Sequence, residues 1–260
     1  MKLGKLVLTG FATLSAIILF QSQAQAKKGG TSILHIMVRA TMSGTTADAG
    51  ATGSVRAKQN QQGNVNNQRL EIVVANLDSN TTYALLAATT DDENLHDVTT
   101  IDTDSNGRAH VKYVKKNNGN ASPGGGPLPD GLDPISKIRA LAISADGSND
   151  VLTADLSNPN KLQYLVKRPL TNDAHSGATA TLRIKATTSV AQLRIRASGL
   201  AATSTYYLAI NGEVAESLTS NAKGRLNATG FPNGSPDVLD IRSLAILDSA
   251  SNSVLSTPLP

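Results

Sequence analysis

The chain has 260 residues, of which 40% are hydrophobic, only 3% are aromatic and none is cysteine, and its formal net charge is +4 at pH 7. The absence of cysteine excludes disulfides, thiol catalysis, iron–sulfur clusters and cysteine-based zinc sites. The scarcity of aromatic residues argues against a stacking platform for sugars or single-stranded nucleic acid, and no Lys/Arg run with interleaved aromatics indicates a nucleic-acid partner.

The first 26 residues have the pattern of a cleaved export signal. Two lysines precede an uncharged apolar run over residues 6–20, and Ala24-Gln25-Ala26 forms a small-x-small cleavage site. The run is shorter than the ~20 residues that a membrane-spanning helix needs, so we favour a leader over a membrane anchor. We expect a mature chain from Lys27 that is periplasmic or extracellular and has no membrane span. It would carry 22 basic against 20 acidic residues, a net charge of +2.

The chain contains an internal duplication. Residues 138–152 and 241–255 align without a gap and are identical at nine of fifteen positions. Residues 50–56 and 177–183 also correspond, and so do the segments that follow them, which marks two copies of one unit. We predict two domains, 32–156 and 161–260, which touch because the four-residue linker between them is short.

Alternating apolar and polar residues predict antiparallel strands. Leu34, Ile36 and Val38 share one parity, and Leu70, Ile72 and Val74 repeat the pattern. Seven or eight such strands per copy, separated by turns, favour an all-β fold of two tandem β-sandwiches. The layout is similar to immunoglobulin-like domains in general, without the Cys…Trp…Cys signature of antibody-type domains. The alternative, helices in Ala-rich pieces such as 84–88, is disfavoured by their shortness.

Three connections are longer in the first copy than in the second, by 4, 6 and 14 residues, and they cover 59–68, 91–94 and 115–130. In an up-and-down succession of strands every second connection falls at one end, so these loops should cluster. We predict a recognition surface there for an unidentified protein or cell-surface ligand. The alternative is drift in loop length at little thermodynamic cost. The candidate binding residues are Gln61, Asn64, Asn67, Asp91, Asp92, Glu93, Lys115, Lys116 and Asn118.

Residues 102–107 read DTDSNG and match the opening of a calcium loop, with Asp102, Asp104 and Asn106 as candidate ligands. Tyr113 stands where an EF-hand has its last glutamate, and the second copy lacks the acidic residues. The same residues suit an Asp/Asn-Gly turn between strands, which we favour. Calcium remains the alternative, and no other cofactor is expected.

No motif of a known catalyst is present, neither a nucleophile elbow nor a phosphate or dinucleotide loop. We interpret the four histidines (His35, His96, His110 and His175) as incidental surface or loop residues, and residues 91–93 as a solvated acidic loop. We therefore predict no catalytic residues and a non-enzymatic binding or structural module. A calcium-stabilised adhesive module and an enzyme of another type are the alternatives.

Overall fold

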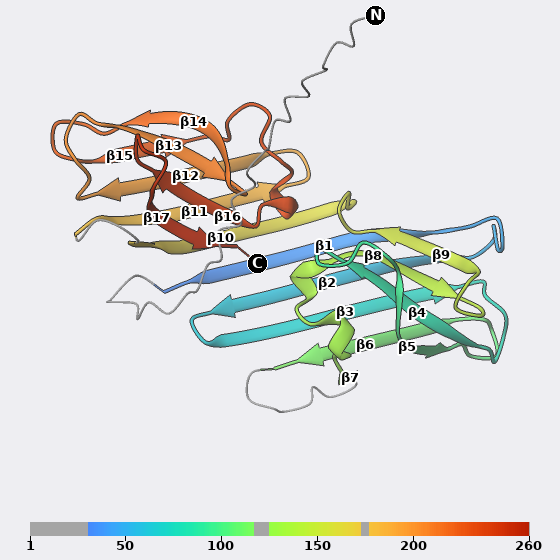
Figure 1. Cartoon of the computed structure of the whole chain (residues 1–260). Coiled ribbons are helices and arrows are strands. Elements are labelled where there is room, and N and C mark those ends of the chain that lie inside the picture. Colours follow the sequence, from blue (N-terminus) through green and yellow to red (C-terminus); the bar gives the residue numbers. More distant parts are fainter. Residues whose placement is uncertain (1–30, 117–124, 173–176, 260) are drawn as a thin grey trace, which may run out of the picture.

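The computed structural model describes residues 31–116, 125–172 and 177–259, so the predicted leader, Asn118 and His175 lie outside the described residues. The described part is all-β, with seventeen strands and three short 3-10 helices (Figure 1). The N-terminal half (residues 31–156) contains β1 (Ile33–Gly44), β2 (Thr52–Gln62), β3 (Val65–Ala75), β4 (Thr82–Thr89), β5 (His96–Asp102), β6 (Ala109–Lys115), β7 (Gly126–Pro127), η1 (Asp130–Leu132), η2 (Ile135–Lys137), β8 (Ile138–Ser144) and β9 (Asp150–Asp155).

The C-terminal half (residues 157–259) repeats this arrangement. It contains β10 (Lys161–Asn172), β11 (Thr179–Thr187), β12 (Ala191–Ser198), β13 (Thr205–Ile210), β14 (Glu213–Thr219), β15 (Leu226–Thr229), η3 (Val238–Asp240), β16 (Ser243–Leu247) and β17 (Ser253–Pro258). The strand order is β5-β4-β8-β9-β1-β2-β3-β6 in the N-terminal half and β14-β13-β16-β17-β10-β11-β12-β15 in the C-terminal half. Equivalent strands thus occupy equivalent places.

The two halves share one curled antiparallel sheet, because β1 pairs with β10. The expectation of an all-β fold is confirmed, whereas two separate immunoglobulin-like sandwiches are not established. The register of this junction is symmetric. Ile36 lies opposite Tyr164, and these two residues occupy equivalent positions in their halves. The halves are therefore related by a pseudo-twofold axis that passes between these two residues, normal to the sheet.

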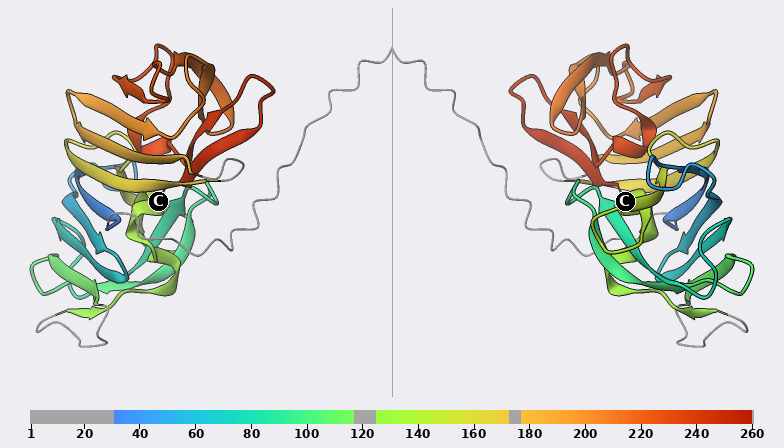
Figure 2. Two further views of the ribbon diagram at one scale, coloured as in Figure 1. Left: turned by 90° about the vertical axis from the view of Figure 1, so that its left-hand side faces the viewer. Right: turned by 90° about the vertical axis from the view of Figure 1, so that its right-hand side faces the viewer.

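The eight strands β6, β3, β2, β1, β10, β11, β12 and β15 run across the molecule as a continuous layer, with the two-residue β7 beside β6. The other eight strands curl over the same side of this layer in both halves (Figure 2). The sequence explains this arrangement. In β11, TATLRIKAT alternates strictly between exposed and buried residues, so one face is apolar and the other polar. The buried sides of both halves form one apolar cluster. We call the opposite, solvent-facing side of the eight strands the outward face.

A second contact joins the halves on the inner side. Arg139 and its counterpart Arg242 both donate to the carbonyl oxygen of Leu239, and both lie 3.5 Å from a carboxylate oxygen of Asp240. Burial lowers the pKa of Arg139, and Asp240 partly offsets this effect. Together with the β1–β10 pairing, these contacts fix the halves relative to one another.

The structure corrects two sequence-based expectations. Residues 84–88 belong to strand β4, so the helical alternative is wrong. Residues 59–68 are not a loop but the end of the β2–β3 hairpin, whose turn is Gly63-Asn64. The polar run was mistaken for a loop because it lacks apolar alternation. It forms strands because its backbone is paired, and because Gln59 and Gln68 are buried with their amides hydrogen-bonded.

Candidate functional site

The described parts of the elongated segments are linked at one end of the N-terminal half: Gln68 of 59–68 lies opposite Lys115 of 115–130, and the other contacts run through η2, which follows that segment. The side-chain oxygens of Gln68 and Gln59 on the β2–β3 hairpin accept hydrogen bonds from the backbone N–H groups of Ile135 (2.7 Å) and Ser136 (3.1 Å) in η2. Lys137, at the end of η2, pairs with Asp91 of the β4–β5 connection at 2.5 Å. The hairpin, the β4–β5 connection and the segment before β8 are therefore in contact.

The polar groups at this end largely satisfy one another. Lys115 and Gln68 both bind the carboxylate of Asp133, and Asp92 pairs with His96 at 2.8 Å. Among the candidate residues, Asn64, Asn67, Glu93 and Lys116 are exposed and Gln61 is half-buried. Although burial opposes the shift, the ion pair with Lys115 and the hydrogen bond from Gln68 lower the pKa of Asp133. We call this end, made of the β2–β3 hairpin tip, the β4–β5 connection and η2, the tied cap. A few exposed polar side chains surround it.

The DTDSNG segment is a turn between β5 and β6. Asp104 Oδ1 accepts the backbone N–H groups of Asn106 (2.8 Å) and Arg108 (3.0 Å). In the C-terminal half Asn221 makes the same two hydrogen bonds, at 2.9 and 3.0 Å, without a carboxylate. The turn geometry therefore needs no metal. Asp102 Oδ1 accepts from the Thr82 hydroxyl across the strand pair, at 2.6 Å.

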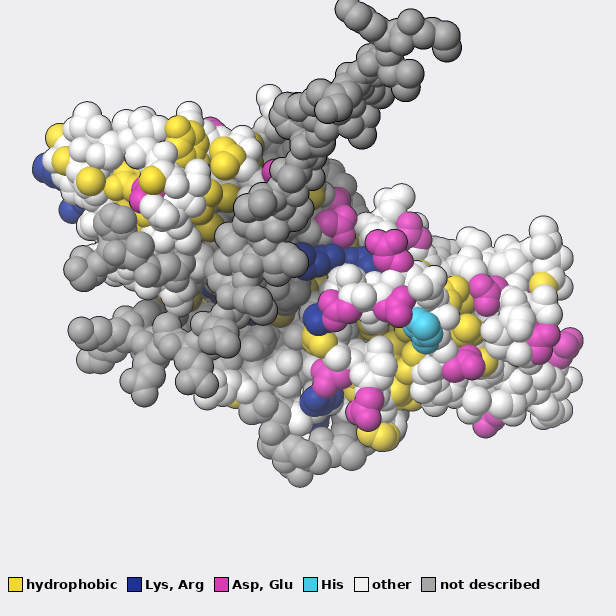
Figure 3. All heavy atoms as spheres, viewed as in Figure 1, with side chains coloured by type: hydrophobic (Ala, Val, Ile, Leu, Met, Phe, Trp, Pro, Cys, Tyr) yellow, Lys and Arg dark blue, Asp and Glu magenta, His cyan; other side chains and the backbone are white. Residues whose placement is uncertain are grey.

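The charged residues of the fold are segregated between its two layers. The eight strands of the continuous layer hold thirteen Lys or Arg residues and one acid, Glu71. The eight curled-over strands (β4, β5, β8, β9, β13, β14, β16 and β17) hold one basic residue, Arg139, and six acids. On the side seen in Figure 3, where the curled-over strands of the N-terminal half lie in front, Asp and Glu side chains are prominent. Eleven of the thirteen stand at outward positions, the exceptions being Lys115, which binds Asp133, and Arg168, which donates to the Pro258 carbonyl. The outward face is therefore strongly basic, whereas the net charge of the whole chain is only +4.

Cations on the outward face stand directly opposite one another on neighbouring strands. In the first cation row, Arg56, Arg39 and Lys161 are adjacent on β2, β1 and β10. In the second cation row, Lys167, Arg183 and Arg194 are adjacent on β10, β11 and β12. None of these six cations forms an ion pair. Like charges at directly opposed positions destabilise a sheet, so the fold keeps these pairs at a cost in stability.

The two cation rows are related by the pseudo-twofold axis. Arg39 and Lys167 are equivalent residues of β1 and β10, and Arg56 and Arg183 are equivalent residues of β2 and β11. Beyond Glu71 the first row reaches Lys112 on β6, and the equivalent turn residues Arg108 and Arg225 are exposed just before β6 and β15. A hollow of 420 Å³ between β12 and β15 is lined by Arg194, Arg196, Arg225 and three uncharged residues.

Glu71 is the one acid among the eight strands, and it is held by its neighbours. Its carboxylate pairs with Arg69 at 2.7 Å and with His110 at 3.0 Å, and its side chain is 19% exposed. Burial opposes ionisation, but hydrogen bonds from His110 and Arg69 outweigh it and lower the pKa of Glu71. The cation rows therefore have no counter-charge beyond this one carboxylate at the outer end of the first row.

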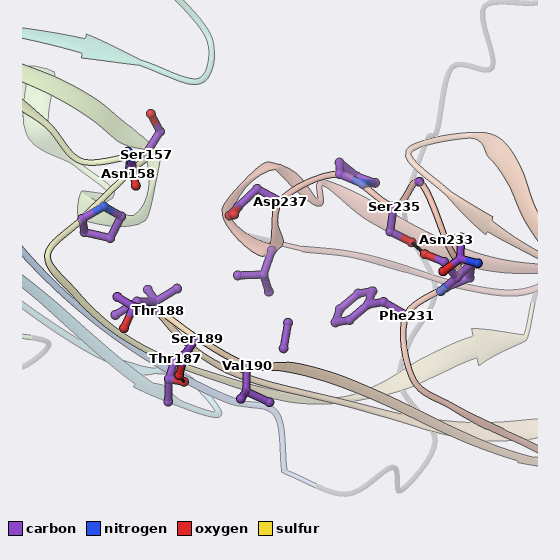
Figure 4. A pocket seen from close by; sticks show the side chains of 17 residues that line it. Ser157, Asn158, Thr187, Thr188, Ser189, Val190, Phe231, Asn233, Ser235 and Asp237 are labelled. Atoms are coloured by element: carbon purple, nitrogen blue, oxygen red, sulfur yellow. Dashed lines mark hydrogen bonds between the residues drawn. The ribbon is translucent and has the colours of Figure 1, made fainter.

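A larger hollow, of 680 Å³, lies elsewhere, between the linker of the halves, the β11–β12 turn and residues 231–238 (Figure 4). Its one ionisable side chain is Asp237, which accepts the backbone N–H of Leu239 at 2.9 Å and so caps η3. Thr187, Ser189 and Val190 face Phe231 across it. It contains no pair of converging acid and base groups.

The described residues contain no cluster of three or more His, Asp or Glu suited to a metal ion. His35 bonds to Asn60 at 2.5 Å, so the described histidines have separate partners. No helix in the described ranges is long and apolar enough to cross a membrane. Comparison with protein-family models, curated proteins and solved structures gives no match for this chain.

The basic face was missed by sequence reasoning, although its signal is present. The segments VRAK of β2, LRIK of β11 and LRIR of β12 place basic residues at alternate positions, all of one parity. Alternation predicts that these residues point away from the core. The net charge hides the pattern, because acids elsewhere in the chain cancel it. Opposed cation pairs cannot be found without the strand register.

Proposed function

We propose that this protein is an exported, non-enzymatic binding module that attaches to a polyanionic ligand through the outward face of its sheet. The observation that supports it is the pair of cation rows, six Arg or Lys residues placed opposite one another, with Glu71 beside Arg56 as the one acid in either row. The two halves act as rigid sandwich-like scaffolds. Each strand fixes the backbone spacing of its cations, so binding has to order only the side chains.

The repulsion between the opposed cations is relieved when a polyanion binds, which gives the basic face a function. A bound polyanion places negative groups between the cations and removes their mutual repulsion. It also releases its own condensed counter-ions, so binding should weaken steeply as salt rises. Arginine supplies four of the six row cations, and its planar fork matches carboxylate, sulfate and phosphate groups in two-point contacts.

Retention on a heparin column, read as the salt concentration at elution, tests the proposal. The triple variant Arg39→Gln, Arg56→Gln, Lys161→Gln should elute at much lower salt than the unmodified protein. In solution the slope of log affinity against log salt should fall by about one per cation removed.

The matched control lowers the net charge by three away from the outward face, with Thr100→Asp, Ser217→Asp and Lys223→Gln, and it should elute close to the unmodified protein. Equal loss in both variants would mean that net charge alone decides retention. No retention of the unmodified protein at low salt would overturn the proposal.

A second candidate is recognition of a protein or cell-surface ligand by the tied cap of the N-terminal half. Its support is the linking of the β2–β3 hairpin tip and the β4–β5 connection through η2, with Asn64, Asn67, Glu93 and Lys116 exposed around them. Capture of a partner from envelope extract should be lost in Asn64→Ala, Asn67→Ala, Glu93→Ala but kept in the variant of the first cation row. Capture that depends on the cation row alone would reject the cap.

A further inference from the structure

We infer that the ligand of the outward face is a single linear acidic polysaccharide chain that runs diagonally across both halves and contacts both cation rows. This inference rests on the proposed function and adds the class of ligand and its path. It follows from three features: the offset between the two rows, the chemistry of the face, and the symmetry of the β1–β10 junction.

The two cation rows lie on opposite sides of the pseudo-twofold axis. The first row crosses β1 at Arg39, and the second row meets β1 at Ile33, where Lys167 is the opposed residue of β10. Six residues of extended strand separate these positions, which corresponds to about 20 Å. Because the first row extends toward β2 and the second toward β12, the line that joins them is diagonal. Lys58 and Lys185 flank the axis between them.

The cations therefore form a stripe and not an even coat. Off the diagonal, the outward residues at the tip of the β2–β3 hairpin (Gln62, Val65 and Asn67) are uncharged, and so are Thr187 and Gln192 at the equivalent β11–β12 hairpin. A stripe a few side chains wide fits a thin chain with charges repeated along its length. A flat anionic membrane would meet these uncharged hairpin residues as well, and it gives no reason for the diagonal.

The chemistry of the stripe separates a polysaccharide from nucleic acid. Outward positions of the eight strands carry no Phe, Tyr or Trp, because Tyr113 and Tyr164 point into the core. Single-stranded nucleic acid is normally held by base stacking on such rings. A duplex is read by an element inserted in a groove, and the strands of this open face have no such projection. An acidic polysaccharide needs only regularly spaced cations for its carboxylate or sulfate groups.

The experiment measures affinity and stoichiometry for heparin fragments of defined length, by calorimetry at low salt, on the full protein. Fragments that reach only one row should bind weakly, with two fragments per protein. Fragments longer than the separation of the rows should bind one per protein and at least tenfold more tightly, because the second contact becomes intramolecular. A polyuronate of matched length should behave in the same way.

Two variants test the path. Arg39→Gln, Arg56→Gln, Lys161→Gln removes the first row, and Lys167→Gln, Arg183→Gln, Arg194→Gln removes the second. Either change should reduce the affinity for long fragments to that for short ones, and circular dichroism should show an unchanged fold. Affinity that does not depend on fragment length, or a row whose removal has no effect, would overturn the inference.

Competing ligands separate failure of the inference from failure of the proposed function. Vesicles with anionic lipid and a short DNA duplex are measured beside the heparin fragments. Tighter binding to the vesicles or to the duplex would overturn the polysaccharide while the polyanion function stands. Absence of binding to all three would overturn both.

Discussion

Removing one cation from the first row should make the protein more stable. Arg39 is exposed and lies opposite Arg56 on one side and Lys161 on the other. Two unit charges about 5 Å apart repel by roughly 0.8 kcal/mol at the dielectric constant of water. Directly opposed like charges in sheets cost about 0.2–1 kcal/mol each. After allowance for solvent screening, Arg39→Gln should raise the free energy of unfolding by about 1 kcal/mol at low salt.

Thermal melting as a function of salt measures this effect. For a chain of this size about 1 kcal/mol corresponds to a rise in Tm of roughly 2–4 °C. The rise should shrink as salt increases, because the screening length falls from about 30 Å at 0.01 M to about 3 Å at 1 M. Arg196→Gln is the matched control. Arg196 is an exposed outward arginine whose opposed neighbours, Thr181 and Asn227, are uncharged.

Two results would refute the reasoning. If Arg196→Gln stabilises as much as Arg39→Gln, the gain comes from lowering net charge and not from the opposed pairs. If Arg39→Gln lowers Tm at every salt concentration, packing of the arginine stem outweighs the repulsion. The cation rows would then be structural, and the argument from uncompensated charge to a polyanionic ligand would lose its basis.

Three further changes test other parts of the structure. Tyr83→Phe should cost about 1 kcal/mol in a denaturant titration, because the buried Tyr83 hydroxyl accepts the backbone N–H of Asp78 at 3.0 Å. Asp104→Asn should change the free energy of unfolding by no more than about 0.5 kcal/mol, because Asn221 forms the same turn in the C-terminal half. Millimolar calcium should not shift the Tm of either protein. A Tm that rises with calcium in the unmodified protein alone would restore the metal site. Asp133→Asn should destabilise near neutral pH. Because the folded-state pKa of Asp133 is lowered, its contribution is present above the ordinary carboxyl pKa and is lost as pH falls through the folded pKa, so melts of the two proteins should converge in acid.

The extent to which the sequence predicted this fold can be judged strand by strand. Residues with apolar alternation, such as Leu70 to Val74, form strands with the expected face buried. The polar end of the β2–β3 hairpin was missed because its order depends on hydrogen bonds from η2, some seventy residues away in the chain. The same η2 segment also binds Asp91 through Lys137, so it links the hairpin tip to the β4–β5 connection. Their mutual hydrogen bonding could not be predicted, since it depends on side-chain geometry across distant segments.

The junction of the halves could not be predicted either. β1 and β10 each read as a strand of a separate domain, and nothing in their sequences favours pairing with one another over burial within each half. The structure shows that this pairing merges two small faces into one of eight strands. If the halves were separate domains, their cations would lie on two unrelated surfaces. A continuous sheet places Lys161 beside Arg39 and so completes the first cation row with a residue from the other half.

The halves differ at one position of the rows, and this difference makes the positive charge of the outward face unequal between them. Glu71 ends the first cation row, whereas its counterpart Arg194 continues the second. Glu71 is engaged by Arg69 and His110, so it neutralises cations of its own half and leaves those at the axis uncompensated. Beyond Arg194, the hollow lined by Arg196 and Arg225 adds positive charge on the C-terminal side. A chain bound across the axis would therefore meet the denser cations on β11, on β12 and in the turn before β15. Loss of the second row should accordingly weaken binding more than loss of the first, a difference that the two triple variants measure directly.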